Sequence, residues 1–425
     1  WLKSCTSGSS EIAFRTKGPS RGIHLASCER QRIISLMLRC ILSLFIGLWP
    51  VLSSADSSIL VGSAGCDADD TGCVEGAEGD EEVVQEVIVD STGHMKLAMG
   101  RYNTGGRPVW IAVDKNRGCE IVTLADKDSL YSIGHTGTAA SGGAAPVFAA
   151  FTNLGGTLLV ANYHGPDDVN VSTGSGVASF KVGTDCSLHL VDFLPHNGSS
   201  VDPKRQRSSH VHSIYPGRHG IAYACDLGMD TITVYLVQAD SKLTYMSTWK
   251  VTPGSGPRHV LEHPKLDMIY VVNEMGQSVS VFRWDIGRLT MVQEIVIASG
   301  GSAAAGSKAA ELVITDDGTR LFVTNRGKEN TVTGFDINAE GELQNKVTVE
   351  APAYPRGMVL LATEKLLLLA GQSKSELWTY TWDLKLQGKL SSASNSEPGV
   401  PSLPPHPAAL AVRFSLASRA SPISI

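Results

Sequence analysis

The residues PRHVLEHPKLDMIYVVNEMGQSVSVFRWD, at positions 257–285, recur as AAELVITDDGTRLFVTNRGKENTVTGFDI at 309–337. A looser third copy, PRGMVLLATEKLLLLAGQSKSELWTYTWD, occupies 355–383. Each copy reads as a strand, a tight turn, a second strand, a polar loop and a third strand. A unit of this size cannot bury its own hydrophobic face, so the units must pack against one another. The repeat therefore predicts an all-β fold, a β-propeller of four-stranded blades.

Weaker copies precede these three and begin near residues 95, 146 and 210. The copy near residue 95 lacks an opening strand, whereas HPAALAV at 406–412 has the pattern of an opening strand with no blade after it. We expect the C-terminal strand to complete the N-terminal blade, which closes the ring and removes exposed sheet edges. Six units are readable over a propeller domain at 95–414, and residues 119–143 look too short for another blade.

The composition excludes some classes of function. A hydrophobic content of 42% with 18% charged residues fits a sheet-rich globular protein. The net charge of −6 gives no reason to expect a nucleic acid partner. A small molecule is the partner that these numbers leave open.

The N-terminal residues are expected to lie outside the fold. Residues 1–36 precede Met37, and a basic start, an apolar run and small residues before Asp56 make residues 37–55 typical of a secretory signal peptide. A membrane anchor over 33–52 is the alternative, and Arg39 within it would cost roughly 2.5–3.5 kcal/mol at a helix centre. We therefore expect a secreted or secretory-pathway protein without stable membrane insertion, or a cytoplasmic one if residues 37–55 are not a signal.

Residues 56–94 are acidic and rich in Gly and Ser, which predicts a disordered linker, and residues 415–425 are a short tail. Five cysteines follow Ala55, and an odd number does not indicate a disulfide framework, although Cys66 and Cys73 could pair. Cys225 is expected to be a small buried strand residue. Sequons at Asn170 and Asn197 agree with a secreted glycoprotein.

Polar residues recur at two places in each unit. In an antiparallel blade the first strand begins, and the second ends, at the same edge of the sheet, and around a ring those edges meet at one end of the central channel. The first strands begin near His210, His212, Arg258, Glu311 and Arg356, and the second strands end near Asn162, Asp226, Glu274 and Arg326.

These residue types point to chemistry on an anion. Arg binds carboxylate or phosphate through its planar fork, and a charge beside a narrow channel must be paired or serve a ligand. His and Glu can move protons near neutral pH. Asn and Asp at strand ends can simply cap a turn, which is the plainer interpretation of Asn162.

A metal site is a weaker alternative. His210 and His212 are two residues apart on one strand and would point to the same side, where Glu274 or Asp226 could complete a ligand set. The chain has no Gly-x-Ser-x-Gly elbow, no His-Glu-x-x-His and no cysteine pair at zinc spacing.

Several short motifs, taken together, resemble the propeller-type lactonase family, which includes bacterial 6-phosphogluconolactonases and, more distantly, fungal carboxy-cis,cis-muconate cyclase. The motifs, in order, are His-Val-His (210–212), Asp-Leu-Gly (226–228), Gly-Pro-Arg-His (256–259), Val-Asn-Glu (272–274), Ala-Ala-Glu (309–311) and Asn-Arg-Gly (325–327). The resemblance implies seven blades and lactone chemistry that needs no metal or other cofactor. By motif it implies a catalytic group of His212 (or His210), Arg258, Glu274 and Arg326. The remaining polar residues at strand starts and strand ends are the substrate-binding candidates: His210, Asn162, Asp226, Glu311 and Arg356.

We therefore expect a hydrolase that opens a sugar-derived or other anionic lactone. Two alternatives remain open at this point: a cycloisomerase of the muconate type, and a non-catalytic propeller that binds a protein or glycan. Two features depart from the family pattern. A blade is missing between the first unit and residue 146, and a secretory signal does not suit a sugar phosphate made inside cells.

Overall fold

A computed structural model describes residues 56–63, 82–135, 137–153, 155–165, 174–285, 288–391 and 402–415. In these ranges the chain forms 28 strands in seven four-stranded sheets, with two short 3₁₀ turns, Ala125–Lys127 and Arg218–Gly220. The predicted all-β, seven-bladed propeller is confirmed. No helix among the described residues is long and apolar enough to cross a membrane. The predicted signal peptide, Cys66, Cys73 and Asn170 lie outside the described residues.

The N-terminal half of the described chain forms three sheets, and the first of them also contains a strand from the C-terminal part. The first sheet contains β28 (Pro407–Ser415), β1 (Ser57–Ser63), β2 (Val83–Val89) and β3 (Met95–Asn103). The second contains β4 (Pro108–Asp114), β5 (Cys119–Leu124), β6 (Ser129–Ser132) and β7 (Thr138–Ala140). The third contains β8 (Pro146–Phe151), β9 (Thr157–Asn162), β10 (Gly176–Val182) and β11 (Leu188–Pro195).

Four sheets follow in chain order. The fourth contains β12 (Val211–Pro216), β13 (Ile221–Asp226), β14 (Thr231–Val237) and β15 (Leu243–Lys250). The fifth contains β16 (Pro257–Glu262), β17 (Met268–Asn273), β18 (Ser278–Asp285) and β19 (Arg288–Val296). The sixth contains β20 (Ser307–Ile314), β21 (Arg320–Gly327), β22 (Thr331–Ile337) and β23 (Leu343–Glu350). The seventh contains β24 (Pro355–Leu361), β25 (Leu366–Gly371), β26 (Glu376–Thr381) and β27 (Leu386–Ser391).

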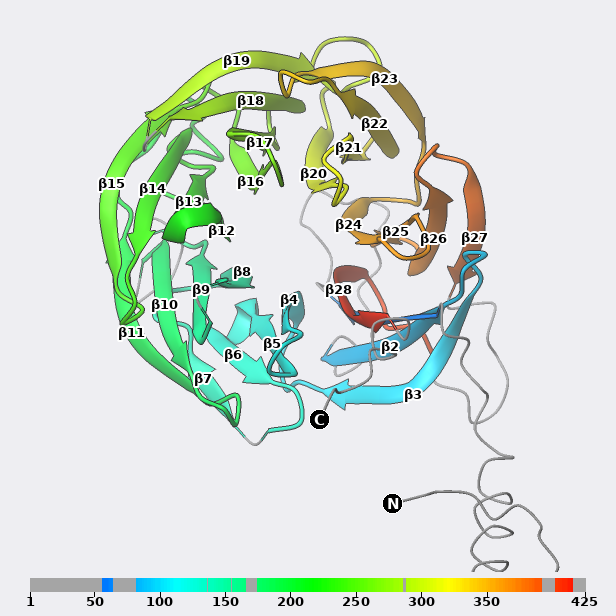
Figure 1. Cartoon of the computed structure of the whole chain (residues 1–425), viewed down its shortest axis with the longest axis horizontal. Helices are drawn as coiled ribbons and strands as arrows, with labels where there is room; N and C mark the ends of the chain where they lie inside the picture. The colour runs from blue at the N-terminus through cyan, green and yellow to red at the C-terminus, as the bar shows by residue number, and fades with distance from the viewer. Residues whose placement is uncertain are drawn as a thin grey trace, which may run out of the picture. The chain divides into compact units, whose positions relative to one another are not determined.

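The core is distributed around the ring. Seven hydrophobic clusters each lie between two neighbouring sheets. Strand β17 shows how the sequence produces this: Tyr270 packs toward the sixth sheet, and Val271, the next residue, packs toward the fourth. Successive side chains of a strand point to opposite faces, so a strand covered on both faces reads as a continuous apolar run. The inner strands β4, β8, β12, β16, β20, β24 and β28 form a closed circuit of contacts (Figure 1).

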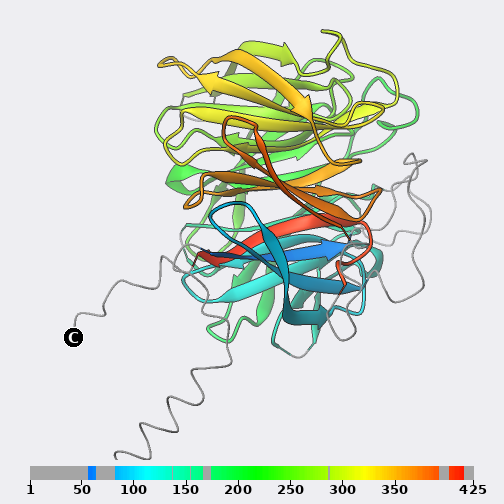
Figure 2. The same ribbon diagram turned by 90° about the vertical axis from the view of Figure 1, so that its right-hand side faces the viewer.

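The C-terminal strand closes the ring, as predicted. β28 pairs with β1 from Ser57↔Ser415 to Ser63↔Pro407. In Figure 2, β28 (red) lies beside the blue strands from the start of the described chain. The prediction that residues 56–94 form a disordered linker is wrong, because β1 and β2 belong to this range. Averaging the composition over the acidic segment hides two seven-residue strands, and one of them is stabilised by a partner about 350 residues away.

The expectation that a blade is missing before residue 146 is also wrong, although residues 119–143 contain only three of its four strands. The second sheet is complete because two of its strands are very short: β6 has four residues and β7 has three. Its inner strand, β4, is part of what the sequence pattern assigned to the first unit. The first blade instead takes its inner strand from β28, so seven blades fit where six were readable.

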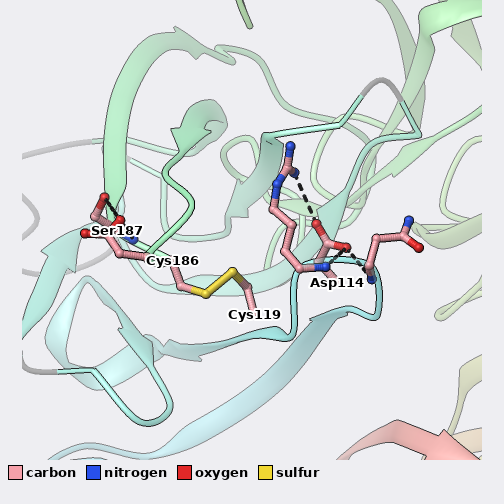
Figure 3. The surroundings of a disulfide bond; sticks show 7 residues. Asp114, Cys119, Cys186 and Ser187 are labelled. Carbon is pink, nitrogen blue, oxygen red and sulfur yellow. Dashed lines mark hydrogen bonds and ion pairs between the residues drawn. A yellow bond between two sulfur atoms is a disulfide. The ribbon is translucent and has the colours of Figure 1, made fainter. Parts of the chain in front are cut away.

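A disulfide links the second and third sheets. Cys119, at the start of β5, is bonded to Cys186, in the turn between β10 and β11 (Figure 3). Both residues are buried in the cluster between these sheets. An odd number of cysteines shows only that they cannot all be paired. The count therefore did not predict this single bond. Cys225 is free and buried, as predicted.

Candidate functional site

Each inner strand carries a β-bulge where it begins. In β16, Pro257 pairs with Asn273 and His259 with Val272, so Arg258 is an extra residue outside the ladder. The same shift occurs at the start of five other inner strands, and β20 has its shift after Ala309, where Ala310 and Glu311 oppose Thr324. A bulge re-aims the side chain that it carries. The end of the channel at which the inner strands begin is called the mouth below.

The bulged residues divide the ring into two arcs. Four consecutive sheets, the polar arc, place His212, Arg258, Glu311 (with Ala310, opposite Thr324) and Arg356 at this position. Three consecutive sheets, the apolar arc, place Ala408, Val109 and Val147 there. The mouth is therefore charged on one side and aliphatic on the other.

Glu274 is the centre of the polar arc. It directly follows β17, and its backbone bonds Gly256 in its own sheet and Ala309 in the next. One carboxylate oxygen, Oε2, lies 3.0 Å from an Arg326 guanidinium nitrogen and 3.3 Å from Nε of Arg258. All three side chains are almost fully buried. Arg258 at a strand start thus lies together with Glu274 and Arg326, which the sequence placed at strand ends.

The charges in this cluster shift one another's pKa. Burial by itself would raise the pKa of Glu274, but Arg326, Arg205 and Arg258 outweigh it and hold that pKa well below its usual range. Burial and the neighbouring Arg326 lower the pKa of Arg258 to about 10, although Glu274 opposes this. Glu274 is therefore a firmly ionised carboxylate that neutralises arginines, and a weak proton acceptor.

Arg205 is a third arginine on Glu274, and the sequence pattern did not reveal it. It lies in the loop between β11 and β12, outside any repeated unit, and donates to Oε1 of Glu274 over 2.8 Å and to the Tyr163 hydroxyl over 3.2 Å. Burial would lower the pKa of Arg205, but Glu274 and Tyr163 raise it overall. With its side chain 32% exposed, it is the most accessible of the three arginines on Glu274.

His212 stands beside this cluster as a neutral base. Burial, Arg258 and His259 hold its pKa well below the usual 6.5, against the opposing effect of Glu274. The ring is positioned by edge contacts to Tyr163 at 5.5 Å and to His259 at 5.1 Å. Its Nδ1 is enclosed and has no hydrogen-bond partner in the described part of the chain.

His259 connects the parts of the site. Its Nδ1 lies 2.8 Å from Oε1 of Glu311, and both residues are buried. A guanidinium nitrogen of Arg258 is 3.4 and 3.3 Å from the two ring nitrogens, so it lies over the ring face. The same arginine donates to the Ala310 carbonyl over 2.7 Å. His259 and Glu311 thus fix the orientation of Arg258 and support the ring of His212.

Two predicted substrate-binding residues are used elsewhere. The Asp226 carboxylate bonds His196, Ser209 and two backbone amides, which leaves it no capacity for a substrate. Asn162 is fully buried and donates to the Ser141 carbonyl. Asp226 therefore caps the end of β13. Asn162 instead joins β9 to the residue that follows β7 in the neighbouring sheet, and its Oδ1 has no partner among the described residues.

His210 and Arg356 remain near the site. His210 stacks on Tyr163 at 4.6 Å, and its Nδ1 is 3.1 Å from the Tyr163 carbonyl. Arg356 is half-buried and close enough to lower the pKa of His212. Among the described residues no group of three His, Cys, Asp or Glu is arranged to hold a metal ion. The suggested His210–His212 ligand pair therefore has no third ligand within that part of the chain.

The family model "Lactonase, 7-bladed beta-propeller" matches residues 77–402. This chain belongs to that lactonase family. The match spans the propeller from the N-terminal blade to the segment before β28. Its seven blades agree with the seven sheets described above.

Relatives of this lactonase family member include a 6-phosphogluconolactonase of Bacillus subtilis. It is 30% identical over 242 residues, which cover 55% of this chain and 64% of the relative. An uncharacterised protein of Lactococcus lactis subsp. cremoris is 29% identical over 301 residues, 70% of this chain and 80% of its own. A 6-phosphogluconolactonase of Formosa agariphila is 28% identical over 260 residues, 59% of this chain and 70% of its own.

Solved structures share the fold of this chain. The Pseudomonas aeruginosa periplasmic gluconolactonase superposes with a TM-score of 0.68 at 23% identity, covering 85% of this chain and 100% of the other. A protein from Lactobacillus plantarum gives a TM-score of 0.68 at 20% identity, covering 84% and 98%. At these identities the likeness concerns the fold.

Proposed function

We propose that this protein hydrolyses the lactone of a sugar-derived acid at the polar arc of the mouth. The observation that carries the proposal is Glu274 holding Arg205, Arg258 and Arg326 together beside a neutral histidine. Family membership and relatives named 6-phosphogluconolactonase support the lactonase class.

The charge balance favours a substrate with an anionic group. Three arginines contact Glu274, and Lys308 and Arg356 also act electrostatically on this cluster. These five basic side chains outnumber the two carboxylates, Glu274 and Glu311. Arginine binds a carboxylate or phosphate through two parallel hydrogen bonds, and a cationic site also stabilises the oxyanion that forms when the lactone carbonyl is attacked.

Each site residue then has a distinct role. Arg205 is the most accessible of the three arginines on Glu274, which suits it to the substrate anion. Arg258 and Arg326 face the developing oxyanion. His212, neutral at physiological pH, accepts the proton of the attacking water and returns it to the leaving alkoxide. Either His212 or Glu274 could serve as base on sequence grounds, but the strongly lowered pKa of Glu274 favours His212.

The compartment bears on which anion the substrate carries. A buried disulfide between Cys119 and Cys186 favours maturation in an oxidising compartment, in line with the signal sequence expected at residues 37–55. Asn197 of the sequon is exposed on the loop that carries Arg205, so a glycan can be attached there. A sugar lactone with a carboxylate suits both the cationic mouth and this compartment better than a sugar phosphate does.

The direct test is hydrolysis by the purified protein of three lactones: gluconolactone, 6-phosphogluconolactone and glucarolactone. Acid release is followed at constant pH. We expect glucarolactone to have the highest kcat/KM, and Arg258→Lys to lower it about 10- to 100-fold because an ammonium lacks the guanidinium fork. No hydrolysis of any lactone by folded protein would refute the lactonase proposal and favour a binding module.

The compartment is tested separately. Peptide mapping of native protein without reduction should find Cys119 linked to Cys186, and glycosidase treatment should reduce the mass of the peptide containing Asn197. Two alkylatable thiols and an unmodified Asn197 would point to a cytoplasmic protein. A muconate-type cycloisomerase remains the second candidate, because that reaction needs the same arginines but no activated water. Its activity would be detected by identifying the cyclised product, since the reaction releases no acid.

A further inference from the structure

The centre of the ring holds a partly open cavity of about 490 Å³ to which the proposed chemistry assigns no substrate. All seven inner strands contribute to its wall, and most of the lining is aliphatic or aromatic. The polar side chains in this wall are few: His259, Glu311, Tyr215 and Asn153. Ligand sites in proteins have this size and this mixture, a mostly apolar wall with a few placed polar groups.

A layer of rings lies at the mouth end of this cavity. Trp110 and Phe148 pack at 4.4 Å, and each lies 5.3 Å from the ring of His259. These three rings come from β4, β8 and β16, so they meet across the channel. Arg258 contacts Glu274 on the mouth side of the layer, whereas its neighbour His259 lines the cavity on the other side. The cavity therefore adjoins the mouth at Glu311 and extends away from it along the channel, past Ala150 and Leu360.

Glu311 is the charged group of this cavity. It is only 5% exposed and lines the cavity. Its Oε1 accepts hydrogen bonds from His259 over 2.8 Å and from the Leu312 amide over 3.1 Å. No described residue bonds its second oxygen, Oε2. Oε2 is not among the fully enclosed atoms, so a ligand in the cavity can reach it, and the mostly apolar wall makes an ionised oxygen there costly unless a donor does so.

The surroundings restrict what that donor can be. A cationic ligand would meet Arg258 and Arg356, which both act electrostatically on His259. An anionic ligand would meet Glu311 itself. A neutral hydroxyl group avoids both repulsions and can donate one hydrogen bond to a carboxylate. The flat rings of Trp110 and Phe148 favour an aromatic body, which packs on them in offset or edge contact.

We propose that this cavity is a second ligand site, which binds a compact neutral aromatic molecule carrying one hydroxyl group. The hydroxyl donates to Oε2 of Glu311, and the ring packs beneath Trp110 and Phe148. This site does not depend on lactone hydrolysis at the mouth, so either proposal can hold without the other.

The ligand enters from the face opposite the mouth. A neighbouring cavity of about 400 Å³ shares Asn153, Tyr215, Pro216 and Leu261 with the first one. Its other wall residues, such as Arg218 and Asp316, follow the ends of the inner strands. The two cavities together lead from the ring layer to that opposite face.

The test is calorimetric titration of the full protein with 2-naphthol, and with 2-methoxynaphthalene as the matched probe that lacks the donor. We expect one molecule of 2-naphthol to bind per chain, and the ether to bind at least about tenfold more weakly, because a hydrogen bond to a charged group is lost. No binding of 2-naphthol, or equal binding of the two probes, overturns the proposal.

Variants locate the site. Ala150 and Val359 are half-buried residues on different parts of the wall. Ala150→Phe should fill the cavity and abolish 2-naphthol binding, and Val359→Phe should do the same if Ala150→Phe does not fold. Arg205→Ala, at the mouth, should leave binding unchanged. Binding that survives both wall variants, or that Arg205→Ala abolishes, places the probe elsewhere and refutes the assignment.

Discussion

The polar and apolar arcs of the ring share one backbone arrangement but differ in the side chains at their bulges. Every inner strand in both arcs carries a bulge, but the bulged residue is charged or a histidine in four sheets and aliphatic in three. The apolar arc contains the closing strand β28 and the disulfide. The polar arc contains Glu274 and the arginines that contact it from β16 and β21. Ring closure and the charged cluster are thus placed in different halves, which meet at Tyr163, the residue after β9 that contacts His212 and Arg205.

The largest expected effect comes from removing residues 402–425, which include β28. The apolar arc would lose the strand that pairs with β1, and the side chains of Ile59 and Leu60, which pack in clusters completed by β28, would be exposed. We expect no cooperative thermal transition and no activity, since the polar arc cannot be held in place by an open ring. A truncated protein that melts like the full chain would show that β28 does not close the ring.

Glu274→Gln should give the next largest effect. Removing one charge leaves Arg258 and Arg326 buried without a counter-ion, and breaking a buried pair costs about 3–5 kcal/mol. We expect urea unfolding to report a loss of that order, together with a fall in kcat/KM of at least about 100-fold. Unchanged stability would mean that the arginines are neutralised by other groups, and the central place given to Glu274 would be wrong.

Cys119→Ser with Cys186→Ser tests the apolar arc without touching the mouth. The bond closes a segment with a sequence separation of 67 residues, and its removal should lower the free energy of unfolding by about 2–4 kcal/mol. Because the site lies in the other arc, kcat and KM should stay within about threefold of the parent protein. A large change in kcat at unchanged folding would show that the two arcs are coupled.

The pH dependence of stability should come from the polar arc. Burial lowers the pKa of His212 and of His259, so the unfolded chain binds protons that the folded chain does not. Their contribution to stability is full above pH ~6.5 and is lost as the pH falls through the lowered pKa values. Urea unfolding at pH 7.5 and pH 5 should show this loss, and His212→Gln should reduce it. An equal loss in the variant would assign the effect to other groups.

Val147→Ala is expected to have the smallest effect. Val147 is the bulged residue of β8, the counterpart of Arg258 in the apolar arc. Its side chain is half-buried, so the cost in stability should be about 0.5–1.5 kcal/mol and kcat/KM should remain within about threefold. A loss of activity similar to that of Arg258→Lys would mean that substrate contacts both arcs.

Sequence reasoning recovered the ring, its closure and the meeting of Arg258, Glu274 and Arg326, because all three depend on strand ends that recur in every unit. It missed β1 and β2, whose short apolar runs lie in an acidic segment and are stabilised by a strand far along the chain. It also missed Arg205, since a loop position has no periodicity to predict where it folds.

One signal was present and unused. Proline precedes the bulged residue in five inner strands, where a missing N–H does not disturb the first position of the strand. These prolines are Pro108, Pro146, Pro257, Pro355 and Pro407. The pattern at Pro108 marks the blade that seemed absent. The partners in the disulfide had no such signal, because the distance between two sheets cannot be read from cysteine spacing.

The repeated bulge has a consequence for how such a protein can change. A bulged residue stands outside the sheet ladder, so its replacement leaves the backbone hydrogen bonds around it intact. Around the ring from β12, the bulged residues of the seven inner strands are His, Arg, Glu, Arg, Ala, Val and Val. A new ligand preference can therefore evolve, or be selected in a library, through substitutions at seven numbered positions while the scaffold keeps its connections.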